Sequence, residues 1–310
     1  MSLQASLRRV MPAPVRRQLQ TRIPPAVRLR LSPTPAWRIG VGVAPSPLAL
    51  DAAALRPVFD EDTLARAGLG LVADPFAIRQ HGIWFLFFEA VATGQRRGFV
   101  GLATSADARR WTYEGPVLEE PFHLSYPAVF AADDEVFMIP ESSFDGTLRL
   151  YRARAFPTVW ELDRILLRGA AYKDASPFQH QGHWYLLVET SRDHTNDELR
   201  LLHAPHPRGP WTEHPASPVV TGDAGLARPA GRPVPVGDRL VRFAQDCRRG
   251  YGRAVLGIHI EALTPSTYAE TPLPAPLLTP AGPLWSAGGM HHLDVHDTPD
   301  GWVCFVDGRP

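Results

Sequence analysis

One short unit occurs five times in this chain and determines what the chain can fold into. Its first copy, ADPFAIRQHGIWFLFFEA (73–90), has two apolar segments around the turn residues His81 and Gly82. Apolar segments that flank such a turn predict a β-hairpin. Asp74 and Glu89 stand near its outer ends, so a turn centred between residues 81 and 82 places them directly opposite each other. Directly opposed residues of an antiparallel pair point to the same face, about 5 Å apart, and the unit therefore brings two carboxylates together.

The other four copies repeat this arrangement and also close on an acid. They are residues 126–142, 174–190, 229–247 and 291–308, and their closing acids are Glu141, Glu189, Asp246 and Asp307. Further strand-like segments follow the hairpins, among them GFVGLATS (98–105), TLRLYRA (147–153) and ELRLLHA (198–204). Repeats of roughly 50 to 60 residues that consist of short strands are typical of propeller blades. Five copies predict an all-β fold, a five-bladed β-propeller.

The last copy lacks outer strands, because the sequence ends at Pro310. Two segments near the start supply them: WRIGVGVA (37–44) is typical of a third strand and LRPVFD (55–60) of a fourth. An N-terminal strand paired with the C-terminal hairpin closes the ring and removes the open edge. We therefore expect residues 37–310 to form a single propeller domain.

Residues 1–36 form a basic arm in front of this domain. Residues 1–50 contain eight arginines and neither Asp nor Glu, and prolines at positions 12, 14, 24 and 25 prevent one long helix. The arm is either a solvated, partly disordered segment or a surface that contacts anionic lipid or an acidic partner.

Composition narrows the partners and the compartment. The formal net charge is zero, which gives no reason to expect a nucleic-acid partner. Cys247 and Cys304 are isolated, so we expect two reduced thiols and no metal-binding spacing. The chain contains neither an apolar run of about 18 residues nor a secretory h-region, which favours a cytoplasmic protein.

Ionisable and polar side chains are predicted to meet at one end of the central axis. In a propeller the innermost strands surround the axis, and their ends line a funnel. The candidates at the strand starts are Asp74, Tyr126, Asp174, Arg228, Arg232, His291 and His292, and those behind them are Glu89, Glu141, Glu189, Gln245, Asp246 and Asp307. Burying so many such groups costs several kcal/mol each unless they are paired or used, so we interpret the set as a functional site.

Two structural interpretations remain open at this point. Each closing acid is either part of the site or an acceptor for backbone N–H groups of the neighbouring blade. Adjacent residues of a strand point to opposite faces, so only one of His291 and His292 is expected to face the axis. We predict neither a metal nor a cofactor.

The openings ADPF and DASPF and the second strand HWYLL resemble the five-bladed propeller glycosidases of families 43, 32 and 62. The resemblance implies that Asp74 is the base or nucleophile and that Asp174 tunes pKa values. It does not supply the acid, because Gly231-Arg232-Pro233 stands where those enzymes have Glu-Gly-Pro in blade four. Glu141 or Glu189 would have to replace it, or the reaction needs no such acid.

A longer resemblance extends from Trp37 to Arg309. The motifs are LFFE after ADPF, HLSYP (123–127), MIPES (138–142), GRPV (231–234), QDC (245–247) with YG (251–252), and HHLDV (291–295). Together they are similar to the N-terminal domain of plant glucosamine inositolphosphorylceramide transferases and its bacterial counterparts, some of which are joined to formyltransferase-like domains. The resemblance implies a carbohydrate-active protein of cell-surface glycan assembly, with a separate glycosyltransferase or formyltransferase as a partner.

Three functions are compatible with these residues. The preferred one is glycoside-hydrolase-like, with Asp74, Asp174 and either Glu141 or Glu189 as catalytic groups and the other funnel residues binding a sugar or glycan. The second is phosphate-using transfer or phosphorolysis, in which Arg228 and Arg232 bind a sugar phosphate bidentately, unless they only pair with Glu141, Glu189 or Asp246. The third is glycan binding without catalysis.

Overall fold

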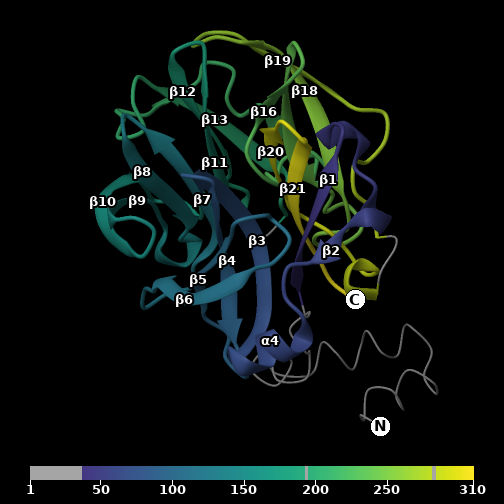
Figure 1. Cartoon of the computed structure of the whole chain (residues 1–310). Coiled ribbons are helices and arrows are strands. Elements are labelled where there is room, and N and C mark those ends of the chain that lie inside the picture. Colours follow the sequence, from purple (N-terminus) through teal and green to yellow (C-terminus); the bar gives the residue numbers. More distant parts are fainter. Residues whose placement is uncertain (1–36, 193–194, 281–283) are drawn as a thin grey trace, which may run out of the picture. The chain divides into compact units, whose positions relative to one another are not determined.

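A computed structural model describes residues 37–192, 195–280 and 284–310. The predicted arm, residues 1–36, lies outside the described residues. The described chain forms five antiparallel sheets, and their innermost strands surround the centre of the ring (Figure 1). This is the five-bladed β-propeller that the five hairpin copies predicted.

The strands of each blade are given from the innermost to the outermost. Blade one is β3 (Leu69–Gln80), β4 (Ile83–Ala92), β5 (Gly98–Ser105) and β6 (Thr112–Leu118). Blade two is β7 (Ser125–Ala132), β8 (Glu135–Glu141), β9 (Thr147–Ala155) and β10 (Val159–Arg168). Blade three is β11 (Lys173–His180), β12 (His183–Glu189), β13 (Glu198–Ala204) and β14 (Thr212–Glu213), with β15 (Val220–Thr221) also paired to β13.

Blade four is β16 (Val234–Val236), β17 (Arg239–Gln245), β18 (Val255–Leu263) and β19 (Tyr268–Pro272). Blade five is β20 (Leu293–Thr298), β21 (Gly301–Gly308), β1 (Arg38–Ala44) and β2 (Arg56–Pro57). Helical turns in the connections are α4 (Glu61–Arg66) and the 3-10 turns η1 (Pro47–Ala49), η2 (Ala52–Ala54), η3 (Ser143–Asp145) and η5 (Leu284–Ser286). None of the described helices is long and apolar enough to cross a membrane.

The ring is closed by the N-terminal strand, as the sequence predicted. β1 pairs with β21 along its whole length, from Arg38 opposite Gly308 to Ala44 opposite Trp302. β2 continues the sheet outward from β1. The last blade thus has four strands although its segments come from both ends of the described chain.

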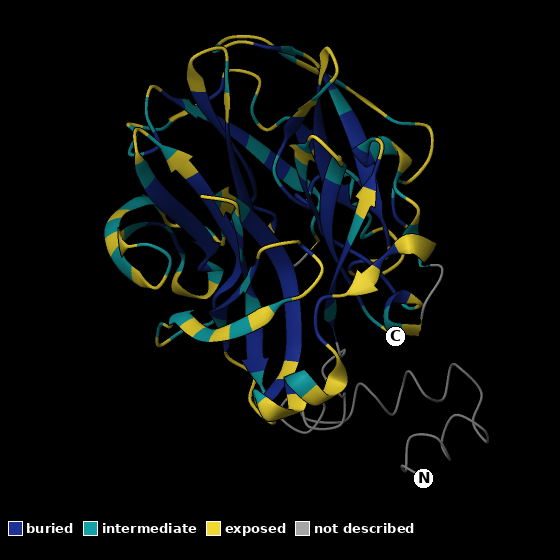
Figure 2. Cartoon of the chain, viewed as in Figure 1, coloured by how far each residue is buried: buried dark blue, intermediate teal, exposed yellow. Residues whose placement is uncertain are grey.

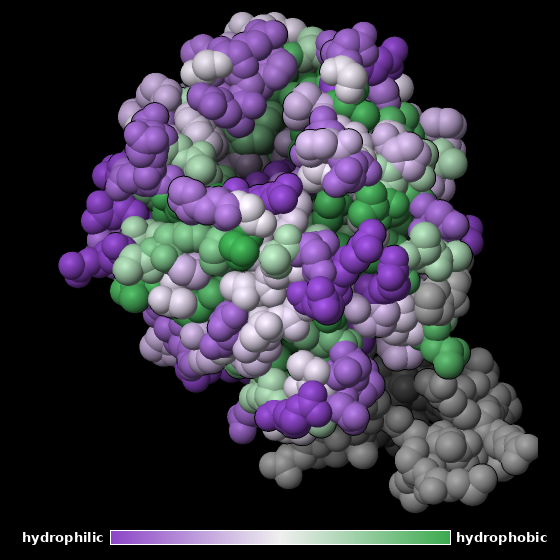
Figure 3. All heavy atoms as spheres, in the orientation of Figure 1, coloured by the Kyte–Doolittle hydropathy of each residue, from purple (hydrophilic) through white to green (hydrophobic). Residues whose placement is uncertain are grey.

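Apolar side chains fill the space between neighbouring blades. Between blades one and two, Phe76 and Phe87 pack with Tyr126 and Met138, all fully buried. Burial of one such side chain contributes about 1.5–3 kcal/mol. The inner strands are accordingly buried, whereas β6 and β10 at the outer edge alternate between exposed and covered positions (Figure 2). The face drawn in Figure 3 is largely hydrophilic, with hydrophobic residues in separate patches.

A bulge near the start of the inner strand recurs in blades one, two and three. The residue before each bulge pairs with the closing glutamate of its blade: Ala73 with Glu89, Ser125 with Glu141 and Lys173 with Glu189. The prediction that Asp74 lies directly opposite Glu89 is therefore wrong by one residue. The shift arises because the bulge adds one residue to β3. The bulge lies at Pro75, which has no N–H to donate to the ladder.

The residue inside each bulge has a left-handed backbone conformation. φ is 51° at Asp74, 45° at Tyr126 and 49° at Asp174. This conformation is uncommon for residues other than glycine. It directs three polar side chains from three blades toward the axis.

Blade four departs from this pattern. Its inner strand β16 has only three residues, preceded by a single bridge between Pro229 and Ala244. Gly231 has a φ of 133°, and a Cβ atom there would lie 2.0 Å from the carbonyl oxygen of Leu293. Backbones of blades four and five thus approach too closely for any side chain at this position.

Candidate active site

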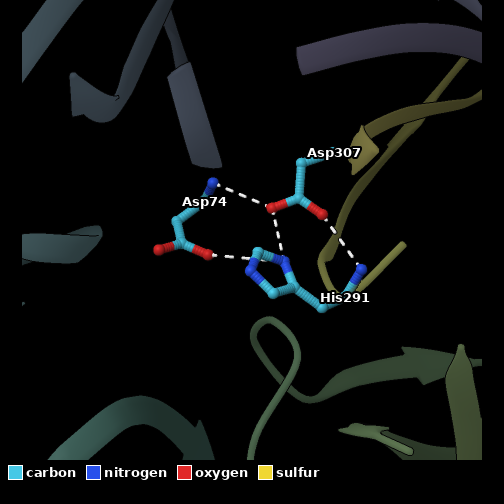
Figure 4. Close-up of side chains that lie close together, drawn as sticks. All are labelled: Asp74, His291 and Asp307. Carbon is cyan, nitrogen blue, oxygen red and sulfur yellow. Dashed lines mark hydrogen bonds and ion pairs between the residues drawn. The ribbon is translucent and has the colours of Figure 1, made fainter. Parts of the chain in front are cut away.

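Asp74 lies at the centre of a buried group that joins blades one, two and five. Its N–H donates to Oδ2 of Asp307 over 3.1 Å, and its own Oδ2 accepts the N–H of Tyr126 over 3.3 Å. Nδ1 of His291 is 2.6 Å from Oδ2 of Asp307 and 3.8 Å from Oδ1 of Asp74 (Figure 4). The two carboxyl groups therefore share one imidazole.

The two carboxyl groups have different proton affinities. Burial, followed by the charges of Asp307, Glu89 and Asp174, raises the pKa of Asp74 well above its usual value. Burial also acts on Asp307, but the contact with His291 outweighs it and lowers the pKa of Asp307. Asp74 consequently has the higher proton affinity of the two.

His291 and His292 both face the carboxyl group of Asp74, which corrects the prediction that only one of them faces the axis. Nδ1 of His292 is 3.9 Å from Oδ1 of Asp74, about as close as Nδ1 of His291. The strand rule does not apply, because both residues precede β20, which begins at Leu293. Burial lowers the pKa of His292 to about 4, so its ring is neutral near pH 7.

The ligand atoms of Asp74, His291 and Asp307 lie within 4.8 Å of one another, a spacing that a metal ion could bridge. Asp307 is already engaged, because its two oxygens accept the N–H groups of Asp74 and His291. That no metal takes part stays a prediction.

Asp174 forms the corresponding centre in blade three. Its Oδ2 accepts hydrogen bonds from Nε of Arg228 and from Nε2 of Gln245, both over 2.6 Å. Its N–H donates to Glu141 over 3.3 Å. Burial raises the pKa of Asp174 to about 6, although Arg228 opposes this effect. Asp174 is thus ionised at pH 7 and half-protonated near pH 6.

Four closing acids differ in how far they are committed to other contacts. Glu141 accepts the N–H of Asp174 and the hydroxyl of Ser143. Glu189 is fully buried and binds Nζ of Lys173 over 2.8 Å. Together with Asp307, Glu141 accepts a backbone N–H of the following blade, as in the structural interpretation.

The other two occupy different surroundings. Glu89 lies 3.2 Å from Nε2 of His123. Asp246 does not face the axis: it pairs with Arg248, and Gln245 takes the inward position of blade four. The end of β17 at Gln245 explains the change, because Asp246 already belongs to the loop.

The blade-four arginines are bound by carboxylates. Arg228 pairs with Asp174 and, over 3.5 Å, with Glu141. Arg232 binds both oxygens of Asp294 and the carbonyl oxygen of Ala77. Glu141 was among the partners expected for these arginines, whereas Asp174 and Asp294 were not.

Tyr126 occupies the bulge of blade two, next to Asp74. Its hydroxyl accepts the N–H of Gly231 over 2.6 Å and lies 2.7 Å from Oγ of Ser176. The residue is fully buried. Its predicted role in substrate binding is untested, and the hydroxyl already joins blades two, three and four.

The sequence matches the family described as "Glucosamine inositolphosphorylceramide transferase 1, N-terminal" over residues 35–309. The chain belongs to this family. Glucosamine inositolphosphorylceramide transferase 1 of Oryza sativa subsp. indica is 34% identical over 297 residues, and that of Arabidopsis thaliana is 31% identical over 300. Each alignment covers 88% of this chain but only 40% and 39% of the plant proteins. Membership of this family supports a carbohydrate-related role.

Solved structures share the fold at low sequence identity. A β-1,2-mannobiose phosphorylase from Listeria innocua has a TM-score of 0.60 at 12% identity, covering 87% of this chain and 96% of its own. A family 117 glycoside hydrolase from Zobellia galactanivorans has a TM-score of 0.55 at 14% identity, covering 88% and 90%. A glycosyl hydrolase from Bacteroides ovatus has a TM-score of 0.55 at 15% identity, covering 77% and 84%.

Two residues of the site, Asp294 and Tyr251, were not predicted from the sequence. Asp294 binds Arg232 and the N–H of Ala77. Tyr251 lies against His291, with ring centroids 5.1 Å apart, and under the guanidinium of Arg228. Both stand inside the motifs HHLDV and YG, and that position was the only available signal.

Proposed function

We propose that this chain binds a glycan at the centre of the propeller and acts on a glycosidic bond there, with Asp74 and Asp174 as the reacting carboxyl groups. The observation that carries the proposal is the repeated backbone strain. Asp74, Tyr126 and Asp174 have φ between 45° and 51° in equivalent bulges. Such conformations cost about 1–3 kcal/mol each, persist where the surrounding structure enforces them, and cluster at active sites.

Cleavage of a glycoside needs a carboxylic acid for the leaving oxygen and a carboxylate near the anomeric carbon. Burial and neighbouring acids raise the pKa of Asp74, which favours its protonated form. Asp174 is ionised above about pH 6 and is oriented by Arg228 and Gln245. In this proposal Asp74 is the acid and Asp174 the carboxylate, which reverses the base role that the glycosidase resemblance implied for Asp74.

Neither glutamate is needed as a relocated acid. Glu189 is sealed by Lys173 and by the N–H of Ser191. Glu141 already accepts from Ser143 and Asp174 and faces Arg228. Sugar-phosphate binding by Arg228 and Arg232 finds less support, because carboxylates bind both guanidiniums.

Glycan binding without catalysis is the second candidate. Asp74 and Asp174 are only 5% and 2% exposed, which leaves little of either carboxyl group open to a substrate. The chain also spans about 40% of the length of its plant relatives, so the transferase activity in their name need not belong to this part. In either case we propose a role in cell-surface glycan assembly.

The test combines hydrolysis and binding by the whole chain. Nitrophenyl glycosides and neutral oligosaccharides are assayed with the wild type, Asp74→Asn and Asp174→Asn. Asp133→Asn is the matched control, because Asp133 also has a positive φ, 48°, but its side chain is 77% exposed at a hairpin turn.

Loss of hydrolysis in both central variants, with an unchanged control, supports the enzymatic proposal. The wild-type rate is then expected to rise with pH through about 6 as Asp174 loses its proton. Binding without turnover in all four proteins identifies a binding module instead. Hydrolysis that survives in both central variants contradicts the assignment of Asp74 and Asp174.

A further inference from the structure

The loop between β17 and β18, residues 246–254 with the sequence DCRRGYGRA, lies directly against the central site. Gly250 and Gly252 have φ of 129° and 63°. A Cβ atom on Gly252 would lie 2.9 Å from the ring of His291. Only glycine permits the loop to approach the histidine so closely.

Tyr251 is the side chain of this loop that contacts His291 and Arg228 of the central site. Desolvation raises the pKa of Tyr251 well above its usual value; Arg228 opposes this, and the charges of Asp174, Asp74 and Glu141 add to it. Its ring lies 5.1 Å from the ring of His291 and 4.9 Å from the guanidinium of Arg228, while 41% of the residue is exposed. The loop thus connects the candidate site with the surface.

Three exposed arginines of the same loop line a cavity. It measures about 500 Å³ and is lined by Arg248, Arg249 and Arg253 together with Asp246, Ala254 and residues of the segment 276–280. Arg248 already binds both oxygens of Asp246, over 2.9 and 3.0 Å. Three arginines and one aspartate leave this cavity with a net charge of +2.

Arg249 and Arg253 differ from Arg228 and Arg232 in having free guanidinium groups. Across residues 37–192, 195–280 and 284–310, neither side chain forms a hydrogen bond or an ion pair, and both are exposed. Arg228 and Arg232, by contrast, already bind carboxylates. A guanidinium binds a phosphate through two parallel hydrogen bonds.

We propose that Arg249 and Arg253 form an anion subsite that binds the phosphate group of a phosphorylated sugar or of a phospholipid-linked glycan. The sugar part would extend past Tyr251 into the central site, and this part of the inference rests on the proposed function. The phosphate part stands on the loop alone. In this proposal Arg249 and Arg253 recognise the phosphate, instead of Arg228 and Arg232.

Calorimetric titration of the whole chain tests the inference with inorganic phosphate, glucose 1-phosphate and glucose. The variant is Arg249→Ala/Arg253→Ala. The control, Arg56→Ala/Arg109→Ala, removes the same charge from two exposed arginines outside the cavity. We expect the first variant to weaken binding of both phosphates about tenfold or more and the control to change it less than twofold. Arg249→Lys/Arg253→Lys should restore binding only in part, because a point charge replaces a bidentate fork.

Vesicles distinguish the two sources of the phosphate. Sedimentation with phosphatidylinositol vesicles, compared with phosphatidylcholine vesicles, reports a lipid headgroup, and binding of glucose 1-phosphate without vesicle binding reports a soluble sugar phosphate. Equal loss in both double variants, or phosphate binding that neither variant weakens, overturns the inference. If inorganic phosphate binds through these arginines while neither glucose nor the nitrophenyl glycosides and neutral oligosaccharides bind, the anion subsite stands and the proposed glycan function fails.

Discussion

The inner strands of blades one and four are held in place by different means. β3 pairs with β4 from Gln80 opposite Ile83 to Leu69 opposite Ala92, interrupted only by two irregularities. β16 pairs with β17 at three positions, and one further bridge joins Pro229 to Ala244. The ladder of its own blade therefore holds β3 along its length. The segment 228–233 keeps two backbone hydrogen bonds to β17, from the N–H of Gln245 to Arg228 and from the N–H of Ala230 to Phe243.

Contacts from the other blades supplement this short ladder. Blade two supplies the hydroxyl of Tyr126 to the N–H of Gly231. Blade five supplies Asp294 to Arg232, and blade three supplies Asp174 to Arg228. The comparison teaches that blade four depends on contacts across the axis, so changes there should cost more than equivalent changes in a ladder or a turn.

Gly231→Ala should have the largest effect. The new Cβ would overlap the carbonyl oxygen of Leu293 at 2.0 Å, and φ of 133° adds strain. A backbone atom cannot move aside as a flexible side chain does, so we expect a loss of more than about 5 kcal/mol in the free energy of unfolding. Urea unfolding and the yield of folded protein measure it. The control Gly237→Ala, with φ of 63° and open space around the Cβ, should cost about 1 kcal/mol.

Arg232→Ala should have the next largest effect. It removes the cation from Asp294, whose side chain is fully buried. Among the described residues, His296 and the N–H of Ala77 remain as its partners. An uncompensated buried charge costs about 3–5 kcal/mol. Arg152→Ala is the comparison, since Arg152 forms half-exposed pairs with Glu135 and Glu161 and should cost at most about 1 kcal/mol. Equal losses in urea unfolding would contradict the special position of blade four.

Local sequence pattern was sufficient to predict the architecture. Alternating apolar segments around turn residues such as His81-Gly82 depend on near neighbours only. The repeat of this pattern predicted five blades, and the missing outer strands of the last copy predicted β1 as the closing strand. These features follow from spacing along the chain.

Contacts between blades were not predictable in the same way. The one-residue shift at Asp74 depends on how a bulge meets the next blade, and the partner of Arg232 depends on β20 entering beside β3. Tyr251 reaches the centre only because Gly252 allows its loop to touch His291. Such pairings join residues far apart in sequence and leave no periodic signal.

The pH dependence of stability tests how blades three and four share Asp174. The ordinary pKa of an aspartate, which applies to the unfolded chain, is 3.8, whereas the pKa of Asp174 in the folded protein is about 6. The folded state therefore binds this proton more tightly, and the group destabilises the folded protein increasingly as pH rises from about 4 to 6. We expect a loss of about 2–3 kcal/mol over this range. Asp174→Asn should abolish that part of the slope, and a slope identical to the wild type in urea unfolding between pH 4 and 7 would refute the shift.

Tyr126→Phe should have the smallest of these effects and isolates a single contact across the axis. The substitution keeps the ring against Phe76, at a centroid distance of 4.8 Å, and removes only the hydroxyl. The buried N–H of Gly231 then loses its acceptor, and the hydroxyl of Ser176 loses a partner. An unsatisfied buried donor costs about 1–3 kcal/mol, so we expect a loss of about 2 kcal/mol.

Tyr172→Phe provides the matched control for this contact. Its hydroxyl donates to the carbonyl oxygen of Arg168 in an exposed position, where water replaces the lost partner, and the change should stay within about 0.5 kcal/mol. Thermal unfolding of both variants measures the difference. Equal stability of the two would mean that the segment 228–233 does not need the hydroxyl of blade two. Amide hydrogen exchange at Gly231 tests the contact directly. Faster exchange of this N–H in Tyr126→Phe, but not in Tyr172→Phe, shows that Tyr126 protects it from water.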